Sequence, residues 1–331
     1  MNKFQLAPSP ITQLTNYDNL YLLREDLNLH GSFKDRALSY QIQYLKNNNI
    51  NTCVISSSGN AAIAAAAHCA ENNIKCIILV SPSTDKAKLS QIIKHKPHLV
   101  IQSKQARRLA NYIHKKHGIY LLNPSKDDKA IEGFESLGQD IHENNPGCQA
   151  IFSYVTSGAS LLGMISYYKK QSDITFPHFI GVQSGEQQFL ACDVFGQIVE
   201  QSEQQIAGKN AINRTPRSNQ IFKELNSPFP KNAKNQPIIN NHVGKIYWVP
   251  EQSILKNLDL LRQNGINSSP EGAAALTAAI DFSRQYPQLK NAVVIISGTE
   301  HETLSIPDDF DIYKANSKED IEQILLSINK K

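Results

Sequence analysis

Several features that would assign a chain to a special class are scarce or missing here. The 331 residues include only five cysteines, an odd number, and no two of them form a Cys-x-x-Cys pair. Four stand in or beside apolar stretches: Cys53, Cys69, Cys76 and Cys148. This pattern favours buried, reduced thiols over disulfides or a zinc site. The ten histidines are scattered, and His301-Glu302 has no second histidine at the spacing of a zinc helix, so no metal centre is predicted.

Charge of one sign and long apolar runs are lacking as well. The net charge is only +4, and basic pairs such as Arg107-Arg108 lie on the polar faces of predicted helices. We interpret them as solvated surface and expect no nucleic-acid partner. No apolar run approaches the length of a membrane span. The opening residues, Met1 to Gln5, lack the apolar core of a signal peptide. We therefore expect a cytoplasmic protein with no membrane partner.

Short apolar runs that alternate with amphipathic helical patterns are the main positive signal. In the first half they are residues 52–55, 76–80, 99–101 and 119–122, and in the second half 150–155, 179–182, 246–249 and 292–296. Ser83 or Thr84 is expected to cap the helix through Leu89. Such alternation predicts right-handed βαβ units and parallel sheets covered by helices on both faces, which is an α/β fold.

The alternation stops between Glu200 and Asn241, where polar residues and prolines dominate. We interpret this segment as surface loop with short helical pieces, such as Asn219 to Leu225. A helix is expected just before it, at residues 189–199.

The stretch Gly31-Ser32-Phe33-Lys34-Asp35-Arg36 joins an irregular turn to a predicted helix. A lysine that acts as a covalent amine needs this setting, because it must be held rigidly and be partly desolvated. An ordinary solvated lysine is the alternative for Lys34 taken alone. Two further turns in the chain favour the interpretation of Lys34 as a covalent amine.

Both of these turns follow apolar strands, at the edge of a parallel sheet where ligands bind. The first is Thr156-Ser157-Gly158-Ala159-Ser160, whose small residues, hydroxyls and free N–H groups at a helix start suit a phosphate. It has neither the Walker ending nor the three glycines of a dinucleotide fingerprint. The second is Ser56-Ser57-Ser58-Gly59-Asn60, whose backbone donors suit a carboxylate. A capped helix start is the structural alternative for each.

An amine, a phosphate turn, a carboxylate turn and a late serine together describe a pyridoxal phosphate site. Here the chain resembles threonine synthase and its relatives in the tryptophan synthase β group, the fold type II pyridoxal phosphate enzymes. The similar segments are Ser9-Pro10-Ile11, Leu23-Arg24-Glu25-Asp26, Gly31 to Arg36, Ser57-Ser58-Gly59-Asn60-Ala61, Glu132-Gly133-Phe134-Glu135-Ser136, Gly181-Val182-Gln183 and Ser269-Pro270-Glu271-Gly272-Ala273-Ala274. The resemblance runs from about Pro8 to about His301.

The resemblance implies roles for individual residues. Lys34 would hold the cofactor as a Schiff base and act as the catalytic base, and Asn60 would contact the ring oxygen. The phosphate would lie on Thr156, Ser157, Gly158, Ala159 and Ser160. Ser57, Ser58 and Gly59 would hold the substrate carboxylate. Ser297 would face the pyridine nitrogen, with Thr299 as the fallback. A neutral hydroxyl there makes a milder electron sink, which fits elimination or replacement better than transamination.

The resemblance also implies two three-layer α/β domains with the cofactor in a cleft between them. The smaller domain would be residues 40–130, and the larger would be residues 1–39 plus 131–331. We expect a pyridoxal phosphate lyase of threonine synthase type, acting on O-phosphohomoserine, with Arg214 and Arg217 as candidate ligands of the substrate phosphate. Alternatives are a serine/threonine dehydratase, a cysteine synthase-type enzyme and a catalytically silent binding module. The partner would be a small amino acid, and the assembly a homodimer.

Overall fold

A computed structural model of the chain describes residues 6–172, 174, 176–184 and 246–328. Contacts divide the chain into two compact units. The first comprises Leu29–Gly133 and the C-terminal segment from His301, and the second comprises Leu6–Asn28 and Phe134–Glu300. The helices expected at 189–199 and 219–225, together with Cys192, Arg214 and Arg217, lie outside the described residues.

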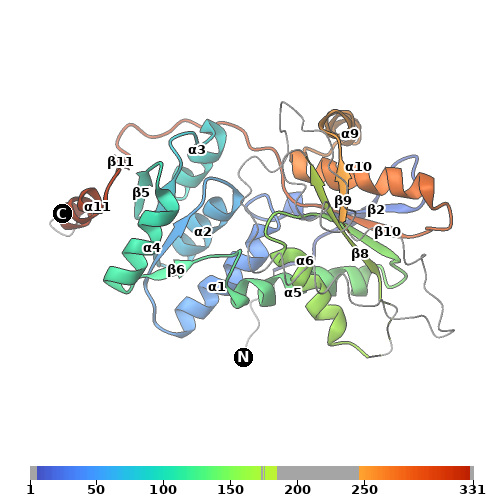
Figure 1. Cartoon of the computed structure of the whole chain (residues 1–331), viewed down its shortest axis with the longest axis horizontal. Coiled ribbons are helices and arrows are strands. Elements are labelled where there is room, and N and C mark those ends of the chain that lie inside the picture. The colour runs from blue at the N-terminus through green and yellow to red at the C-terminus, as the bar shows by residue number, and fades with distance from the viewer. Residues whose placement is uncertain (1–5, 173, 175, 185–245, 329–331) are drawn as a thin grey trace. The chain divides into compact units, whose positions relative to one another are not determined.

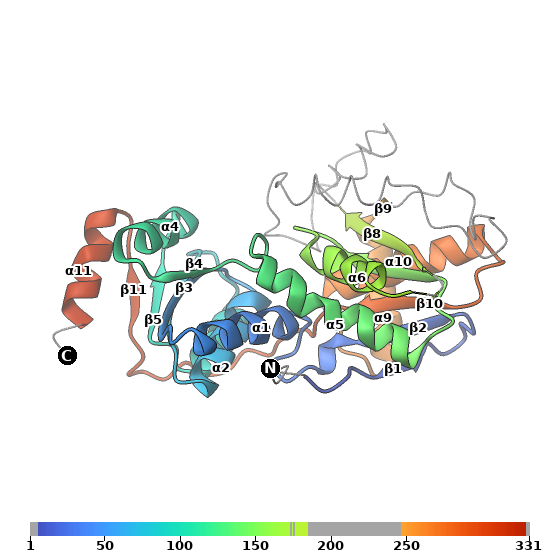
Figure 2. The same ribbon diagram turned by 90° about the horizontal axis from the view of Figure 1, so that it is seen from below.

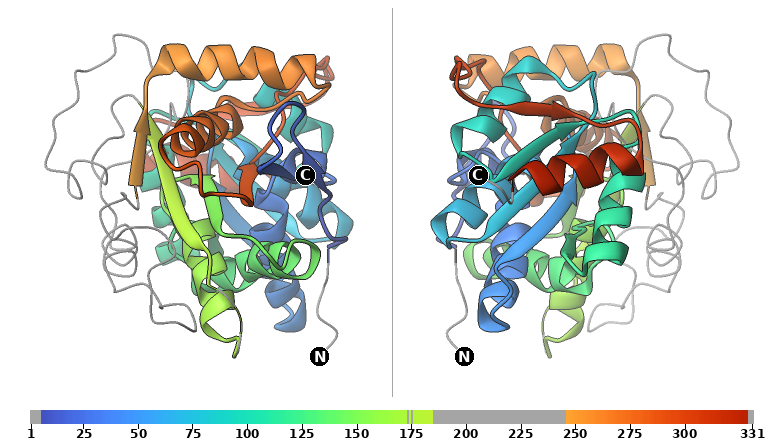
Figure 3. Two further views of the ribbon diagram at one scale, coloured as in Figure 1. Left: turned by 90° about the vertical axis from the view of Figure 1, so that its right-hand side faces the viewer. Right: turned by 90° about the vertical axis from the view of Figure 1, so that its left-hand side faces the viewer.

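The first unit is built on a parallel sheet of five strands in the order β11-β5-β4-β3-β6. The strands are β3 (Thr52–Ser56), β4 (Lys75–Val80), β5 (Leu99–Gln102), β6 (Tyr120–Leu122) and β11 (Ile312–Lys314). Four are consecutive along the chain, whereas β11 comes from the C-terminal segment and pairs with β5 at the sheet edge (Figure 3, right).

Helices cover both faces of this sheet (Figure 2). They are α1 (Lys34–Asn47), α2 (Asn60–Glu71), α3 (Lys86–Lys94), α4 (Ala106–His117) and α11 (Lys318–Ile328). On the face of α4 and α11, Val54 and Ile77 of the sheet join one buried cluster with Leu109 and Ile321. Because side chains alternate along a strand, Cys53 and Ile55 point to the opposite face, where α1 and α2 lie. The unit is therefore a three-layer sandwich.

The second unit has a six-stranded sheet in the order β1-β2-β10-β7-β8-β9. The strands are β1 (Ile11–Gln13), β2 (Leu20–Arg24), β7 (Ala150–Tyr154), β8 (His178–Ser184), β9 (Ile246–Val249) and β10 (Ala292–Ile296). All neighbours are parallel except β1, which pairs antiparallel with β2. The short 3-10 helix η1 (Glu25–Leu27) follows β2.

This second sheet also lies between helical layers (Figure 1). The helices α9 (Glu251–Gln263) and α10 (Pro270–Gln285) lie on one face, and α6 (Ala159–Lys169) and α5 (Asp128–Asn144) lie on the other. A large buried cluster joins α9 and α10 to the sheet, with Phe152 and Phe282 in edge-to-face contact at its centre. The strand β10 is buried along its whole length.

The predicted α/β fold with parallel sheets is confirmed. Cys53, Cys69, Cys76 and Cys148 are buried and free, as the sequence predicted. Among the described residues no helix is long and apolar enough to cross a membrane. The cap of α3 differs from expectation, because the Asp85 carboxylate accepts the first N–H groups of the helix, from Ala87 and Lys88, in place of the Ser83 or Thr84 hydroxyl.

The two units are bounded near residues 28, 133 and 300, whereas the sequence interpretation divides the chain at 39/40 and 130/131. The domain limits stay a prediction, which limited proteolysis tests by the position of the first cuts.

Gly133 packs so closely against the start of α1 that a larger residue there should destabilise the fold. A Cβ at this position would meet Arg36 O at 2.5 Å and Ala37 Cα at 3.0 Å, in the helix that begins with Lys34. We expect Gly133→Ala to lower the free energy of unfolding by about 1–2 kcal/mol, since overpacking against backbone costs about 1–3 kcal/mol and outweighs the better helix propensity of alanine. Urea unfolding followed by circular dichroism measures it.

Gly59→Ala is the matched control for this experiment. A Cβ on Gly59 meets no atom within 4 Å, and its φ of −136° suits any residue. Its free energy of unfolding should stay within about 0.5 kcal/mol of the parent. Equal stability of the two variants would contradict the close packing described for Gly133.

Candidate active site

The residues singled out in the sequence fall into two groups, one in each unit. The first unit contains Lys34 and the turn 57–60, and the second contains the turn 156–160 and Ser297.

Lys34 is the first residue of α1, directly after an irregular turn. The turn is possible because Gly31 adopts a left-handed conformation, with φ of 78°. The helix start is then closed locally, since Asp35 N–H donates to Ser32 O at 3.2 Å and Lys34 N–H donates to Ser32 Oγ at 3.3 Å. The Lys34 side chain is half-buried, with Nζ 4.7 Å from the centroid of the Phe33 ring. The amine is therefore held on a rigid helix and partly desolvated.

The turn 57–60 links the end of β3 to the start of α2. Within the described ranges no side chain caps this helix, so N–H groups of its first turn can meet a ligand. The Ser58 hydroxyl accepts the N–H of Ser81 at 2.9 Å, and this contact ties the turn to the segment after β4. Gly59 opens onto space that a Cβ would enter without contact. The turn thus offers hydroxyls, backbone donors and room, as a carboxylate site requires.

Asn60 has a partner that the sequence interpretation did not identify. The His301 Nε2 lies 3.0 Å from Asn60 Oδ1. Because an amide oxygen only accepts, Nε2 carries the hydrogen and donates it. Burial lowers the pKa of His301 below its usual range, with the nearby Lys88 charge adding to the effect, so the imidazole is neutral at pH 7. The bond orients the Asn60 amide, and its two N–H donors face away from His301.

The turn 156–160 joins β7 to α6 in the second unit. Gly158 stands before the helix with φ of 76° and ψ of 7°, a left-handed conformation that favours glycine. Among the residues that the structure describes, no side chain caps α6 closely, and Ser157 Oγ lies 3.5 Å from the N of Ala159. The first turn therefore presents backbone donors together with the positive end of the helix dipole, a combination that binds anions.

Ser297 follows β10 directly and is only 5% exposed. The pairing of Ala292 with Ala150 and Val294 with Phe152 runs β10 parallel to β7, so Ser297 lies at the same sheet edge as the turn 156–160. Its hydroxyl makes no hydrogen bond within the described part of the chain. Thr299, the fallback, uses its hydroxyl to donate to Asn267 O at 2.8 Å. Ser297 is thus the better placed of the two to meet a ligand.

Curated proteins similar in sequence are enzymes of amino-acid metabolism. The chain is 24% identical over 290 residues to the biosynthetic L-threonine dehydratase of Halalkalibacterium halodurans, covering 85% of this chain and 66% of that protein. It is 25% identical over 312 residues to the cysteine synthase of Buchnera aphidicola, covering 89% and 92%. The chain therefore spans just under two thirds of the length of the threonine dehydratase.

Solved structures share the fold. A pyridoxal 5'-phosphate-dependent aspartate racemase superposes with a TM-score of 0.75 at 18% identity, covering 91% of this chain and 93% of that one. Threonine deaminase isoform 2 from Solanum lycopersicum gives 0.73 at 20% identity, covering 90% and 85%. The family model described as pyridoxal-phosphate dependent enzyme matches residues 4–298. With this match over most of its length, the chain belongs to the pyridoxal-phosphate dependent enzyme family.

Proposed function

We propose that this chain catalyses the elimination of water from a small L-hydroxyamino acid, serine or threonine, giving a 2-oxo acid and ammonia. The observation that carries the proposal is the buried Ser297 hydroxyl at the end of β10, beside the turn 156–160. A hydroxyl at the pyridine nitrogen does not keep that nitrogen protonated as a carboxylate would. The similarity to threonine dehydratases supports this choice of substrate.

The residues present fit pyridoxal phosphate by their donor chemistry. The uncapped start of α6 suits the phosphate. The Lys34 amine would hold the aldehyde carbon covalently, and the Asn60 amide, oriented by His301, has N–H donors to offer the ring oxygen. Ser297 would face the pyridine nitrogen. These roles remain part of the proposal.

When bound, pyridoxal phosphate supplies a sink for the electron pair of the substrate α carbon. The chain's own residues do the rest in this mechanism. The hydroxyls and N–H groups of the turn 57–60 would hold the substrate carboxylate, and the Lys34 amine would take the α-proton as general base. The hydroxyl on the β carbon would leave as water with the proton that the Lys34 ammonium returns, and water would hydrolyse the enamine product to ammonia and the 2-oxo acid.

A different substrate, O-phosphohomoserine, is the main alternative to serine or threonine. The sequence interpretation favoured a threonine synthase-type reaction on O-phosphohomoserine, which needs a second phosphate site. Its candidate ligands, Arg214 and Arg217, lie outside the described residues, and the relatives reported above are a dehydratase and a cysteine synthase. O-phosphohomoserine therefore stays a prediction that product analysis tests. The homodimer likewise stays a prediction.

Lys34 provides the first test. Borohydride treatment of the protein with pyridoxal phosphate should fix the pyridoxyl group on the peptide that contains Lys34. We expect Lys34→Ala to abolish this label and to lower kcat by about 10²–10⁴-fold, the usual contribution of a general base. Lys46→Ala is the control, because Lys46 lies near the other end of the same helix and, among the described residues, its side chain bonds only Asn72, at 3.3 Å on the surface. A label elsewhere than Lys34 contradicts the assignment.

The second test concerns the substrate. Purified protein loaded with cofactor is incubated separately with L-threonine, L-serine, O-phosphohomoserine, and O-acetylserine plus sulfide. We expect ammonia and a 2-oxo acid from threonine or serine, measured by coupled reduction of the oxo acid. Threonine formed from O-phosphohomoserine, or cysteine formed from O-acetylserine, would overturn the dehydratase proposal in favour of replacement chemistry. No product from any substrate would favour the silent binding module.

The third test concerns His301 as a positioning residue. His301→Ala removes the donor that orients Asn60, and a neutral hydrogen bond of about 0.5–1.5 kcal/mol corresponds to a loss in kcat of about twofold to twelvefold. His301→Gln keeps an N–H donor and should recover most of the activity. The absorption maximum of the bound cofactor should shift in the alanine variant and return in the glutamine variant. An unchanged spectrum in His301→Ala would show that Asn60 does not need His301.

A further inference from the structure

Three potential metal ligands of the first unit converge away from the turn 57–60. His30 lies in the segment before α1, and His68 and Glu71 stand one turn apart on α2. The His30 Nε2 is 3.3 Å from Glu71 Oε1, and the His68 Nδ1 is 3.3 Å from Glu71 Oε2. One ligand atom from each residue lies within 4.8 Å of the others. The convergence therefore brings two imidazoles and one carboxylate to a single point.

A buried carboxylate fixes the orientation of the His68 ring. Asp35 Oδ1 lies 3.1 Å from His68 Nε2, and the two side chains are 0% and 2% exposed. The other oxygen, Oδ2, accepts the backbone N–H of His30 at 2.9 Å. His68 Nε2 is therefore the ring nitrogen that donates to this carboxylate, and Nδ1 is the ring nitrogen left to meet an ion. A histidine whose outer nitrogen donates to a carboxylate is the usual arrangement of a metal ligand.

The ring nitrogens that face Glu71, His30 Nε2 and His68 Nδ1, are buried, and no hydrogen bond among the described residues accounts for their burial. Within the described residues, neither His68 Nδ1 nor His30 Nε2 makes a hydrogen bond of good geometry, although their side chains are only 2% and 6% exposed. A lone pair on His68 Nδ1 that faces a carboxylate oxygen at 3.3 Å needs a cation between them. That cation is either a proton or a metal ion.

The geometry favours a metal ion. Both nitrogen–oxygen separations, His30 Nε2 to Glu71 Oε1 and His68 Nδ1 to Glu71 Oε2, are 3.3 Å. They match a tetrahedral ion, whose ligands at about 2.0–2.1 Å lie about 3.3 Å from one another.

We propose that His30 Nε2, His68 Nδ1 and the Glu71 carboxylate bind a divalent transition-metal ion of the Zn²⁺ class. Nitrogen and oxygen donors of this kind suit Zn²⁺ better than Ca²⁺ or Mg²⁺, which prefer oxygen alone. The Glu71 side chain is 43% exposed and gives the ion a path from solvent. Since Asp35 supports His68 and directly follows Lys34, the bound ion stabilises the start of α1.

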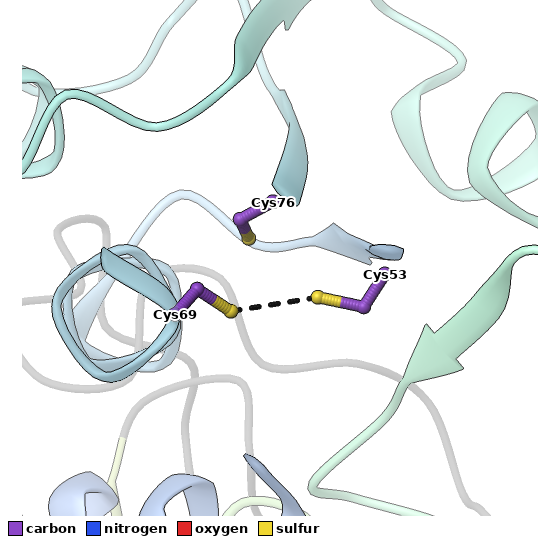
Figure 4. Close-up of side chains that lie close together, drawn as sticks. All are labelled: Cys53, Cys69 and Cys76. Atoms are coloured by element: carbon purple, nitrogen blue, oxygen red, sulfur yellow. Dashed lines mark hydrogen bonds between the residues drawn. The ribbon is translucent and has the colours of Figure 1, made fainter. Parts of the chain in front are cut away.

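The first unit contains a second set of potential ligands, which the test must separate from this one. Cys53 of β3, Cys69 of α2 and Cys76 of β4 converge in the core, with the Cys53 and Cys69 sulfurs 3.5 Å apart (Figure 4). Each residue is at most 1% exposed. Thiols enclosed in this way pack as small apolar side chains and would have to lose their protons in an apolar core before they bind an ion.

The experiment titrates the full-length protein, stripped of metal by chelator, with Zn²⁺ in a calorimeter. We expect one ion per chain, with the affinity lowered at least tenfold in Glu71→Gln and in His30→Asn, and retained in Cys69→Ala. Glu71→Gln changes one half-exposed atom at the end of α2, so the fold should persist, which circular dichroism without metal verifies. Zn²⁺ should raise the Tm of the parent and leave that of Glu71→Gln unchanged.

Cobalt identifies the donors directly. Co²⁺ bound by nitrogen and oxygen gives visible bands without the intense sulfur-to-metal absorption in the near ultraviolet that thiolates produce. Loss of binding in Cys69→Ala with retention in Glu71→Gln, or the sulfur absorption, would move the site to the thiols and overturn the proposal. Absence of any Zn²⁺ binding would overturn it as well, and would assign a proton to His68 Nδ1. Neither readout depends on catalysis, so the outcome is independent of the substrate.

Discussion

The parallel pairing of β10 with β2 and β7 is the constraint on which the second unit depends. It places a strand from near residue 295 at the centre of a sheet whose neighbours begin at Leu20 and Ala150. Parallel strands end at the same edge, so Ser297 and the turn 156–160 are brought to one edge although Ser160 and Ser297 are 137 positions apart in the chain. The fully buried apolar run of β10 fixes this arrangement. The candidate cofactor contacts of this unit thus follow from its core.

In the first unit, hydrogen bonds between distant segments hold the candidate site residues in place. The Asp35–His68 contact holds the start of α1 against α2, and His301 reaches Asn60 across 241 positions of sequence. Each bond fixes the orientation of the side chains that it joins. The nucleophile candidate Lys34 is therefore supported by Asp35 on its own helix, and Asn60 is supported from the C-terminal segment. Both supports belong to the same unit as the residues they position.

The sequence was sufficient for what depends on local pattern. Apolar runs and small-residue turns predicted the parallel sheets, most of the helices, and the locations of Lys34 and Asn60. It was insufficient where a contact joins distant segments. The edge strand β11 is only three residues long and is half exposed, so it has no buried run to signal it. A single histidine carries no periodic pattern, and neither the His301–Asn60 bond nor the convergence of His30, His68 and Glu71 could be predicted without the fold.

The turn 156–160 needs only one glycine to present backbone donors at the start of α6. A phosphate turn needs backbone donors that are free, and a conformation that aims them at the ligand. Gly158 supplies the second requirement, since it alone of the five has a positive φ, 76°. The first requirement concerns N–H groups, which alanine and serine also carry, and α6 leaves them without a side-chain cap. The other residues of the turn therefore keep their backbone donors, and Thr156, Ser157 and Ser160 add three hydroxyls.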